Sequence, residues 1–71
     1  MRIFAKPNLK ATRLKKGYSL STFAEAVGLT KQMIAQIERR ANGISPEKSQ
    51  EVLKVLGVEF DDVFELVERR Q

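Results

Sequence analysis

Two glutamines four residues apart, Gln32 and Gln36, are the side chains whose type and spacing best suit hydrogen-bonding chemistry. A glutamine amide donates and accepts hydrogen bonds at once, and it can bond adenine N6 and N7 in a bidentate way. On a helix with 3.6 residues per turn, Ile34 and Ile37 define the core-facing side. Gln32, Gln36 and Arg39 then fall on the opposite side. This pattern favours a helix that reads base edges, although two glutamines also suit a plain solvated helix face.

Two helices must position these side chains. The sequence predicts one helix from Lys31 to about Arg39, with Thr30 as its N-cap. The helix before it has Ser19 as the expected N-cap and ends at Gly28, because glycine accepts the left-handed backbone conformation at little cost. The three-residue turn Gly28-Leu29-Thr30 has the length of a helix-turn-helix. A tight helical hairpin in any small bundle is the alternative.

Three further helices complete the expected fold. Asn8 is an acceptable N-cap for a first helix that ends at Gly17. Ser45-Pro46-Glu47 supplies a cap, a proline at the first helical position and an acid in the first turn of a helix that Gly57 closes. A fifth helix is expected from about Phe60 to Glu68. Since no stretch of four or more residues alternates like a half-buried strand, we expect an all-α fold, a compact five-helix arrangement.

The chain is short enough for one domain, residues 1–71, because compact domains usually run from about 50 to 250 residues. Residues 1–7 are a candidate N-terminal arm, and residues 69–71 are a tail. The pair Ile3-Phe4 stays unassigned: it packs on the core or belongs to the arm.

Composition excludes several classes of function. The sequence holds no cysteine and no histidine, so a disulfide framework, a thiolate metal site and a Ser-His or Cys-His nucleophile are all ruled out. Asp61 and Asp62 stand at an expected helix start, where a capping and dipole role explains them. We therefore expect no catalytic residue, no cofactor and no metal. No apolar run is long enough to cross a bilayer and no signal peptide is visible, so a cytoplasmic protein is expected.

The charge is unevenly distributed. Residues 1–40 hold nine basic and two acidic residues, a net charge of +7, whereas residues 41–71 hold four basic and seven acidic residues, a net charge of −3. A basic half joined to an acidic half indicates a surface that faces a polyanion. An ordinary solvated surface is the alternative.

Glu38 falls at the edge of the core-facing side of its helix rather than on the exposed side. A half-buried carboxylate needs a partner, because an unpaired buried charge is costly. Arg13 on the first helix is the candidate, which predicts a structural ion pair between Arg13 and Glu38.

From about Leu9 to Leu66 the sequence resembles the Cro and lambda-repressor-like helix-turn-helix domains, also called the XRE family. The residues that carry the resemblance occur in order: Arg13 with Lys16-Gly17, Phe23-Ala24-Glu25, Gly28-Leu29-Thr30, Ile34, Ile37-Glu38-Arg39, Ser45-Pro46, Leu56-Gly57-Val58 and Val63-Phe64. The resemblance implies a compact all-α domain of five helices. It also implies that the helix from Lys31 to Arg39 is the recognition helix of a homodimer on a pseudo-palindromic DNA operator.

The resemblance assigns roles to individual residues. By position, Lys31, Gln32 and Gln36 look like the base readers of the family, and Met33 is placed to touch a sugar or a thymine methyl group. Leu20 departs from the pattern, because many members have a phosphate-anchoring glutamine there, and Arg40 stands where glycine commonly ends the recognition helix. The DNA-phosphate candidates are then Ser19, Ser21, Arg39, Arg40, Asn42 and Lys48.

The fifth helix is the expected dimer interface, with Val63, Leu66 and Val67 as candidates, although single surface leucines are common. The expected function is sequence-specific binding of double-stranded DNA by a transcriptional regulator, a repressor of bacterial, phage or mobile-element type. The alternative is a protein-interaction module with the same fold, such as an antitoxin or anti-repressor component with an unidentified protein partner. RNA binding is less expected, because no aromatic platform is visible.

Overall fold

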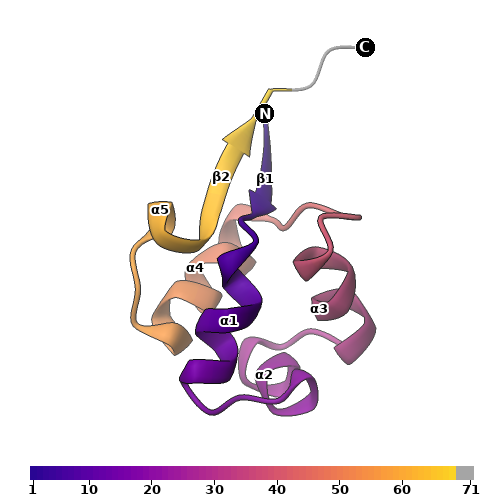
Figure 1. The fold of residues 1–71 in the computed structure, drawn as a ribbon. Coiled ribbons are helices and arrows are strands. Elements are labelled where there is room, and N and C mark those ends of the chain that lie inside the picture. The colour runs from indigo at the N-terminus through magenta and orange to yellow at the C-terminus, as the bar shows by residue number, and fades with distance from the viewer. Residues whose placement is uncertain (69–71) are drawn as a thin grey trace.

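Five helices and two short strands make up residues 1–68, the part of the chain that this computed structural model describes (Figure 1). In chain order the elements are β1 (Arg2–Ala5), α1 (Asn8–Lys15), α2 (Leu20–Val27), α3 (Lys31–Glu38), α4 (Pro46–Leu56), α5 (Phe60–Val63) and β2 (Phe64–Val67). The five expected helices are therefore confirmed. The term all-α is not, because β1 and β2 form a small sheet. The tail expected at residues 69–71 lies outside the described residues.

Local caps explain where α2, α3 and α4 begin. The hydroxyl oxygens of Ser19, Thr30 and Ser45 each accept a hydrogen bond from the backbone N–H three residues later, at 3.1–3.2 Å. These bonds satisfy amides that have no partner within a helix. Gly28 and Gly57 close α2 and α4 with left-handed φ angles of 74° and 68°.

The start of α1 differs from the prediction. Pro7 occupies the N-cap position and makes no side-chain cap, and Asn8 is the first helical residue. The Asn8 amide instead donates to the backbone carbonyl of Asp62 at 2.6 Å, which ties α1 to α5. The Asn8 side chain, which local rules assign to a helix cap, thus bonds a residue that is distant in the sequence.

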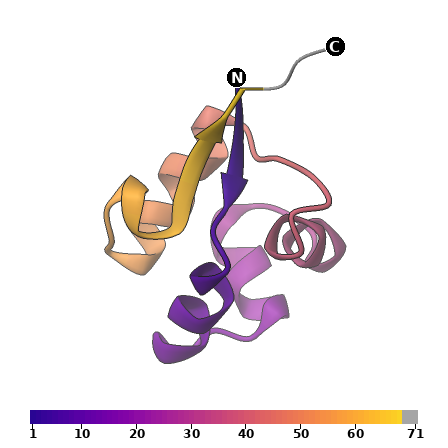
Figure 2. The same ribbon diagram turned by 45° about the horizontal axis from the view of Figure 1, so that its top comes forward.

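The two strands lie at opposite ends of the described chain and pair antiparallel, with Arg2 opposite Val67 and Ala5 opposite Phe64. They stand side by side and lead away from the helices in both views (Figures 1 and 2). The predicted N-terminal arm is thus a strand, and Ile3-Phe4 belongs to it. The other edge of β1 meets the loop before α4, where Ile44 N–H donates to the carbonyl of Ile3 at 2.9 Å.

The predicted fifth helix, Phe60 to Glu68, is too long by more than one turn. The helix stops at Val63, and Phe64 adopts extended φ and ψ angles of −128° and 162°. Phe64 and Val63 are fully buried, and Phe4 and Ala5 of β1 are almost or completely so. As a strand, residues 64–67 satisfy their backbone hydrogen-bonding groups through β1, and Phe64 adds its side chain to the core.

The core lies between the helices and the inner side of the sheet. Its buried apolar residues are Phe4, Ala5, Leu9, Phe23, Ala24, Val27, Ile34, Ile37, Ile44, Val52, Leu56, Val63 and Phe64. Every helix and both strands contribute residues to this set, and the outer side of each element stays exposed to solvent. The core thus fixes the orientation of α2 and α3 relative to each other.

Candidate nucleic-acid interface

The turn between α2 and α3 is held by a dense set of hydrogen bonds. Leu29 N–H donates to the carbonyl of Ala24 at 2.9 Å, and the Gly28 N–H donates to Glu25. The Lys48 ammonium of α4 donates to the Val27 carbonyl at 3.0 Å, which places a cation at the negative end of α2. These bonds fix the angle at which α3 leaves α2.

One side of α3 packs on the core and the other side is open to solvent. Ile34 and Ile37 are 1% and 5% exposed, whereas Lys31 and Gln32 are exposed. The helix lies at one edge of the molecule, and α5 lies at the opposite edge (Figures 1 and 2). The open side of α3 is therefore accessible to a large partner such as a DNA groove.

Met33 and Gln36 extend this open side. Met33 is 45% exposed, one of few large apolar side chains in residues 1–68 to be so. Gln36 is half-buried, and its side-chain oxygen accepts a hydrogen bond of 2.6 Å from the amide of Asn42. All four sequence-predicted base readers thus lie on one helix, outside its buried side.

Arg13 and Glu38 lie against each other beneath this surface. Arg13 Nε is 2.6 Å from Glu38 Oε2, and Arg13 Nη2 is 3.2 Å from Glu38 Oε1. Arg13 Nη1 also donates to the carbonyl of Tyr18 at 2.8 Å. The guanidinium group therefore joins α1, the loop before α2 and the end of α3 in one network, as expected for a bidentate pair.

The phosphate candidates are spread around this surface. Ser21 and Arg39 are exposed, at the start of α2 and the end of α3. Ser19 is exposed too, but its hydroxyl also caps α2 through Thr22 N–H. Lys48 is half-buried and is bonded to Val27 as described above.

Arg40 makes contacts within the chain that the sequence analysis did not anticipate. Its φ angle is +62°, so it does adopt the left-handed conformation that glycine favours at the end of such a helix. Its guanidinium donates to the Ala5 carbonyl at 2.8 Å and to Glu65 Oε2 at 2.6 Å, and it lies over the Phe4 ring. These contacts tie α3 to the sheet, and they engage the guanidinium group that the sequence analysis assigned to phosphate binding.

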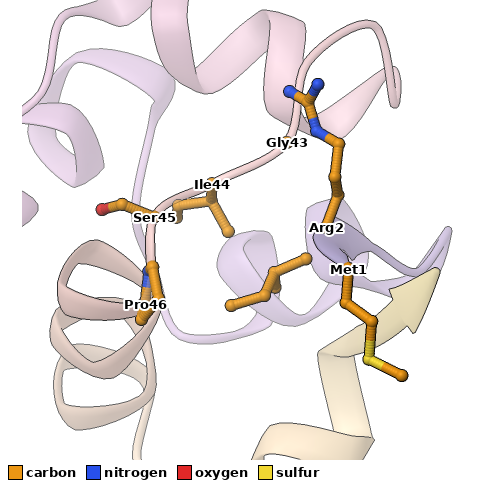
Figure 3. A pocket seen from close by; sticks show the side chains of 7 residues that line it. Met1, Arg2, Gly43, Ile44, Ser45 and Pro46 are labelled. Carbon is orange, nitrogen blue, oxygen red and sulfur yellow. The ribbon is translucent and has the colours of Figure 1, made fainter. Parts of the chain in front are cut away.

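Arg2 is a residue that the sequence analysis did not assign. It lines one hollow together with Met33, Gln36, Asn42 and Gly43. Figure 3 shows its side chain extending toward the Gly43 loop from β1. No local signal could have found this position, because it depends on β1 lying beside a loop some forty residues later in the chain.

Gly43 is needed for that approach. A Cβ atom at this position would lie 2.9 Å from the backbone carbonyl oxygen of Ile3, which is closer than real Cβ atoms come. The contact brings the loop after α3 against β1, so the N-terminal residues border the surface that carries Gln36 and Asn42.

The three residues expected at the dimer interface differ in their exposure to solvent. Val63 is fully buried inside the chain, so it is not available to a second copy, and its place in the expected interface was wrong. Leu66 is 56% exposed and Val67 is half-buried, both on β2. The dimer candidates expected on a fifth helix are thus divided between the core and a strand.

Comparison with known protein families matches residues 9–63 to a family described as helix-turn-helix, the Cro and lambda-repressor-like type. The chain belongs to this XRE family. The family is one of DNA-binding domains and not an enzyme family. Its match runs from α1 to the end of α5, so both strands lie outside it. No curated protein matches the chain. Among residues 1–68, no helix is long and apolar enough to cross a membrane.

Proposed function

We propose that this XRE-family chain binds a specific sequence of double-stranded DNA as a transcriptional regulator, a repressor of bacterial, phage or mobile-element type. The observation that carries the proposal is the open side of α3, with Lys31, Gln32, Met33 and Gln36 exposed or half-buried beside the buried Ile34 and Ile37. A helix with this distribution can enter the major groove and present its polar side chains to base edges. Residues 1–71 act as one domain, in the cytoplasm, where bacterial DNA lies.

The base-reading roles follow from side-chain chemistry. Lys31 reaches guanine acceptors, Gln32 and Gln36 bond base edges through their amides, and Met33 touches a sugar or a thymine methyl group. Each has solvent access along α3. Specificity therefore arises from this one helix.

The phosphate contacts orient the domain on the duplex. Ser19 and Ser21 act at the start of α2, where helix amides also attract anions. Arg39, Asn42 and Lys48 act at the end of α3, in the loop that follows and on α4. These contacts supply affinity that is independent of sequence and weakens with salt.

The chain acts as a homodimer on a pseudo-palindromic operator, because one recognition helix reads only a half-site. Leu66 and Val67 of β2 are the candidate contacts between the copies. Leu66 supports this role, since it is one of four large apolar side chains in residues 1–68 with high exposure. The recognition helices of such a dimer lie about 34 Å apart, one turn of DNA.

A fluorescence titration tests the function. The protein is titrated into a duplex that carries the region upstream of its own coding sequence and into a scrambled duplex of equal composition, each at two salt concentrations. In parallel, bound duplexes are selected from a randomised library. We expect an enriched motif, a preference of about 10³-fold or more for it over scrambled DNA, and weaker binding at high salt. Equal binding to all duplexes with no enriched motif contradicts the proposal and favours a protein-interaction module.

A further inference from the structure

The hydrogen bond between Asn42 and Gln36 links the recognition helix to the loop that follows it. Asn42 Nδ2 donates to Gln36 Oε1 at 2.6 Å. The backbone amides of Ala41 and Asn42 also donate to the Gln36 carbonyl, at 2.9 and 3.4 Å. The loop is therefore fastened to residue 36 through both its main chain and a side chain.

The backbone explains why Asn42 reaches this position. After α3 ends at Glu38, the left-handed conformation of Arg40 turns the chain back on itself. Arg40 is held there by its bonds to Ala5 and Glu65. The turn at Arg40 is therefore what brings Asn42 back toward Gln36 in the free protein.

The direction of the bond determines what Gln36 offers to a partner. A glutamine amide has an oxygen that only accepts hydrogen bonds and an NH₂ group that only donates them. Because Asn42 donates to Oε1, this oxygen is turned toward the loop. The Nε2 group has no hydrogen-bond partner among residues 1–68, so both of its N–H bonds remain for a ligand.

We infer that Asn42 is a positioning residue that sets the base preference of Gln36 by holding its side-chain oxygen and directing its NH₂ group to the DNA. The inference rests on the proposed function. In the major groove, guanine presents two acceptors and thymine presents one, whereas cytosine presents an amino donor and adenine presents an amino donor beside one acceptor. Gln36 held in this orientation prefers guanine or thymine at the base it meets.

The substitution Asn42→Asp reverses this arrangement. A carboxylate only accepts hydrogen bonds, so Gln36 must turn its NH₂ group toward residue 42 and its oxygen toward the groove. The preference then changes to a base with an amino donor, adenine or cytosine. Asn42→Ala removes the constraint, so it reduces discrimination without reversing it.

Ala41→Asp is the matched control. It adds the same negative charge one residue away, at an exposed position whose methyl side chain makes no hydrogen bond to Gln36. Added charge near DNA weakens binding to every sequence alike. We therefore expect Ala41→Asp to rank the four bases as the wild type does. Like Asn42→Asp, it should bind every sequence more weakly.

Selection from a randomised duplex library, followed by titration of the four single-base variants, tests the inference. The position read by Gln36 is the one whose preference disappears in Gln36→Ala. There we expect the wild type and Ala41→Asp to favour guanine or thymine by about tenfold, and Asn42→Asp to favour adenine or cytosine. Circular dichroism verifies that each variant is folded.

Two outcomes overturn the inference, and they are distinguishable. If Asn42→Asp keeps the ranking of the wild type, or changes it no more than Ala41→Asp does, Asn42 supports the loop alone and does not set the base preference. If the folded wild type enriches no motif at all, the proposed function fails, and this inference fails with it.

Discussion

Arg13 and Glu38 form a buried two-bond ion pair that connects α1 to the last turn of α3. Nitrogen and oxygen atoms meet at 2.6 and 3.2 Å, and the two side chains are only 3% and 7% exposed. Glu38 lies two residues after Gln36, so the pair holds the helix that carries the candidate base readers. Removing one partner leaves the other as an uncompensated buried charge, which is strongly unfavourable.

We predict that Arg13→Ala and Glu38→Ala each lower the free energy of unfolding by about 3–5 kcal/mol. The double variant should lose clearly less than the sum of the two, because no unpaired charge remains. Urea unfolding measures all three variants, and Glu38→Gln, which keeps a hydrogen-bond acceptor, gives a milder reference. Strictly additive losses would show that the two side chains are not energetically coupled.

Phe4 should contribute to stability as a core residue and not as part of an arm. It is 3% exposed and lies beneath the guanidinium groups of Arg2 and Arg40. Phe4→Ala is expected to lower the free energy of unfolding by about 3–5 kcal/mol. Leu14→Ala, at a position 55% exposed, is the control and should have little effect. A Phe4→Ala variant as stable as the wild type would show that Phe4 belongs to an arm and does not stabilise the core.

Gln32→Ala should reduce affinity for the selected DNA site by about 1–3 kcal/mol and change binding to random DNA little. Gln32 is exposed on α3, and its amide is available to base edges. Fluorescence anisotropy with both duplexes measures the effect. Gln50→Ala, an exposed glutamine on α4, is the matched control. Equal losses on both duplexes would remove Gln32 from the base readers.

Leu66→Asp should weaken the dimer by at least about tenfold, because a carboxylate replaces an apolar side chain at the proposed contact. Leu14→Asp makes the same change at a position with matching exposure, 55% against 56%, and should leave association unchanged. Sedimentation equilibrium with and without operator DNA measures both variants. Dimers of equal strength would show that Leu66 lies outside the interface.

The parts of the fold that local chemistry determines could be predicted from the sequence. Ser19, Thr30 and Ser45 cap helices, and Gly28 and Gly57 end them, through bonds that span only a few residues. Glu38 could be matched to Arg13 because the helical repeat puts Glu38 at the edge of the core-facing side.

The sheet could not be predicted in this way. Phe60, Val63, Phe64 and Val67 fit a helical repeat, and a short apolar segment of this kind also suits a strand. Residues 64–67 form a strand because they pair with β1, about sixty residues earlier in the chain, where Ala5 lies opposite Phe64. A pattern read over a few neighbouring residues contains no information about that partner.

Part of the candidate site depended on the same distant contacts. Gln32 and Gln36 could be named from the helical repeat of α3, whereas Lys31 and Met33 were named through the resemblance to the family. The role of Arg40 depends on Ala5 and Glu65, and the position of Arg2 depends on the approach of Gly43 to Ile3. The bond from Asn42 to Gln36 follows from the turn at Arg40, whose left-handed conformation is unusual for a residue with a side chain.

The pairing of β1 with β2 also governs the order in which the domain can be completed during synthesis. Domains begin to fold as the ribosome extends the chain, at about 5–20 residues per second. Here β1 cannot pair until β2 has been synthesised, because Phe4 and Ala5 lie opposite Glu65 and Phe64. The sheet and the core beside it therefore close only after residue 67 has left the ribosome, and a chain cut short before β2 leaves the hydrophobic side of β1 uncovered.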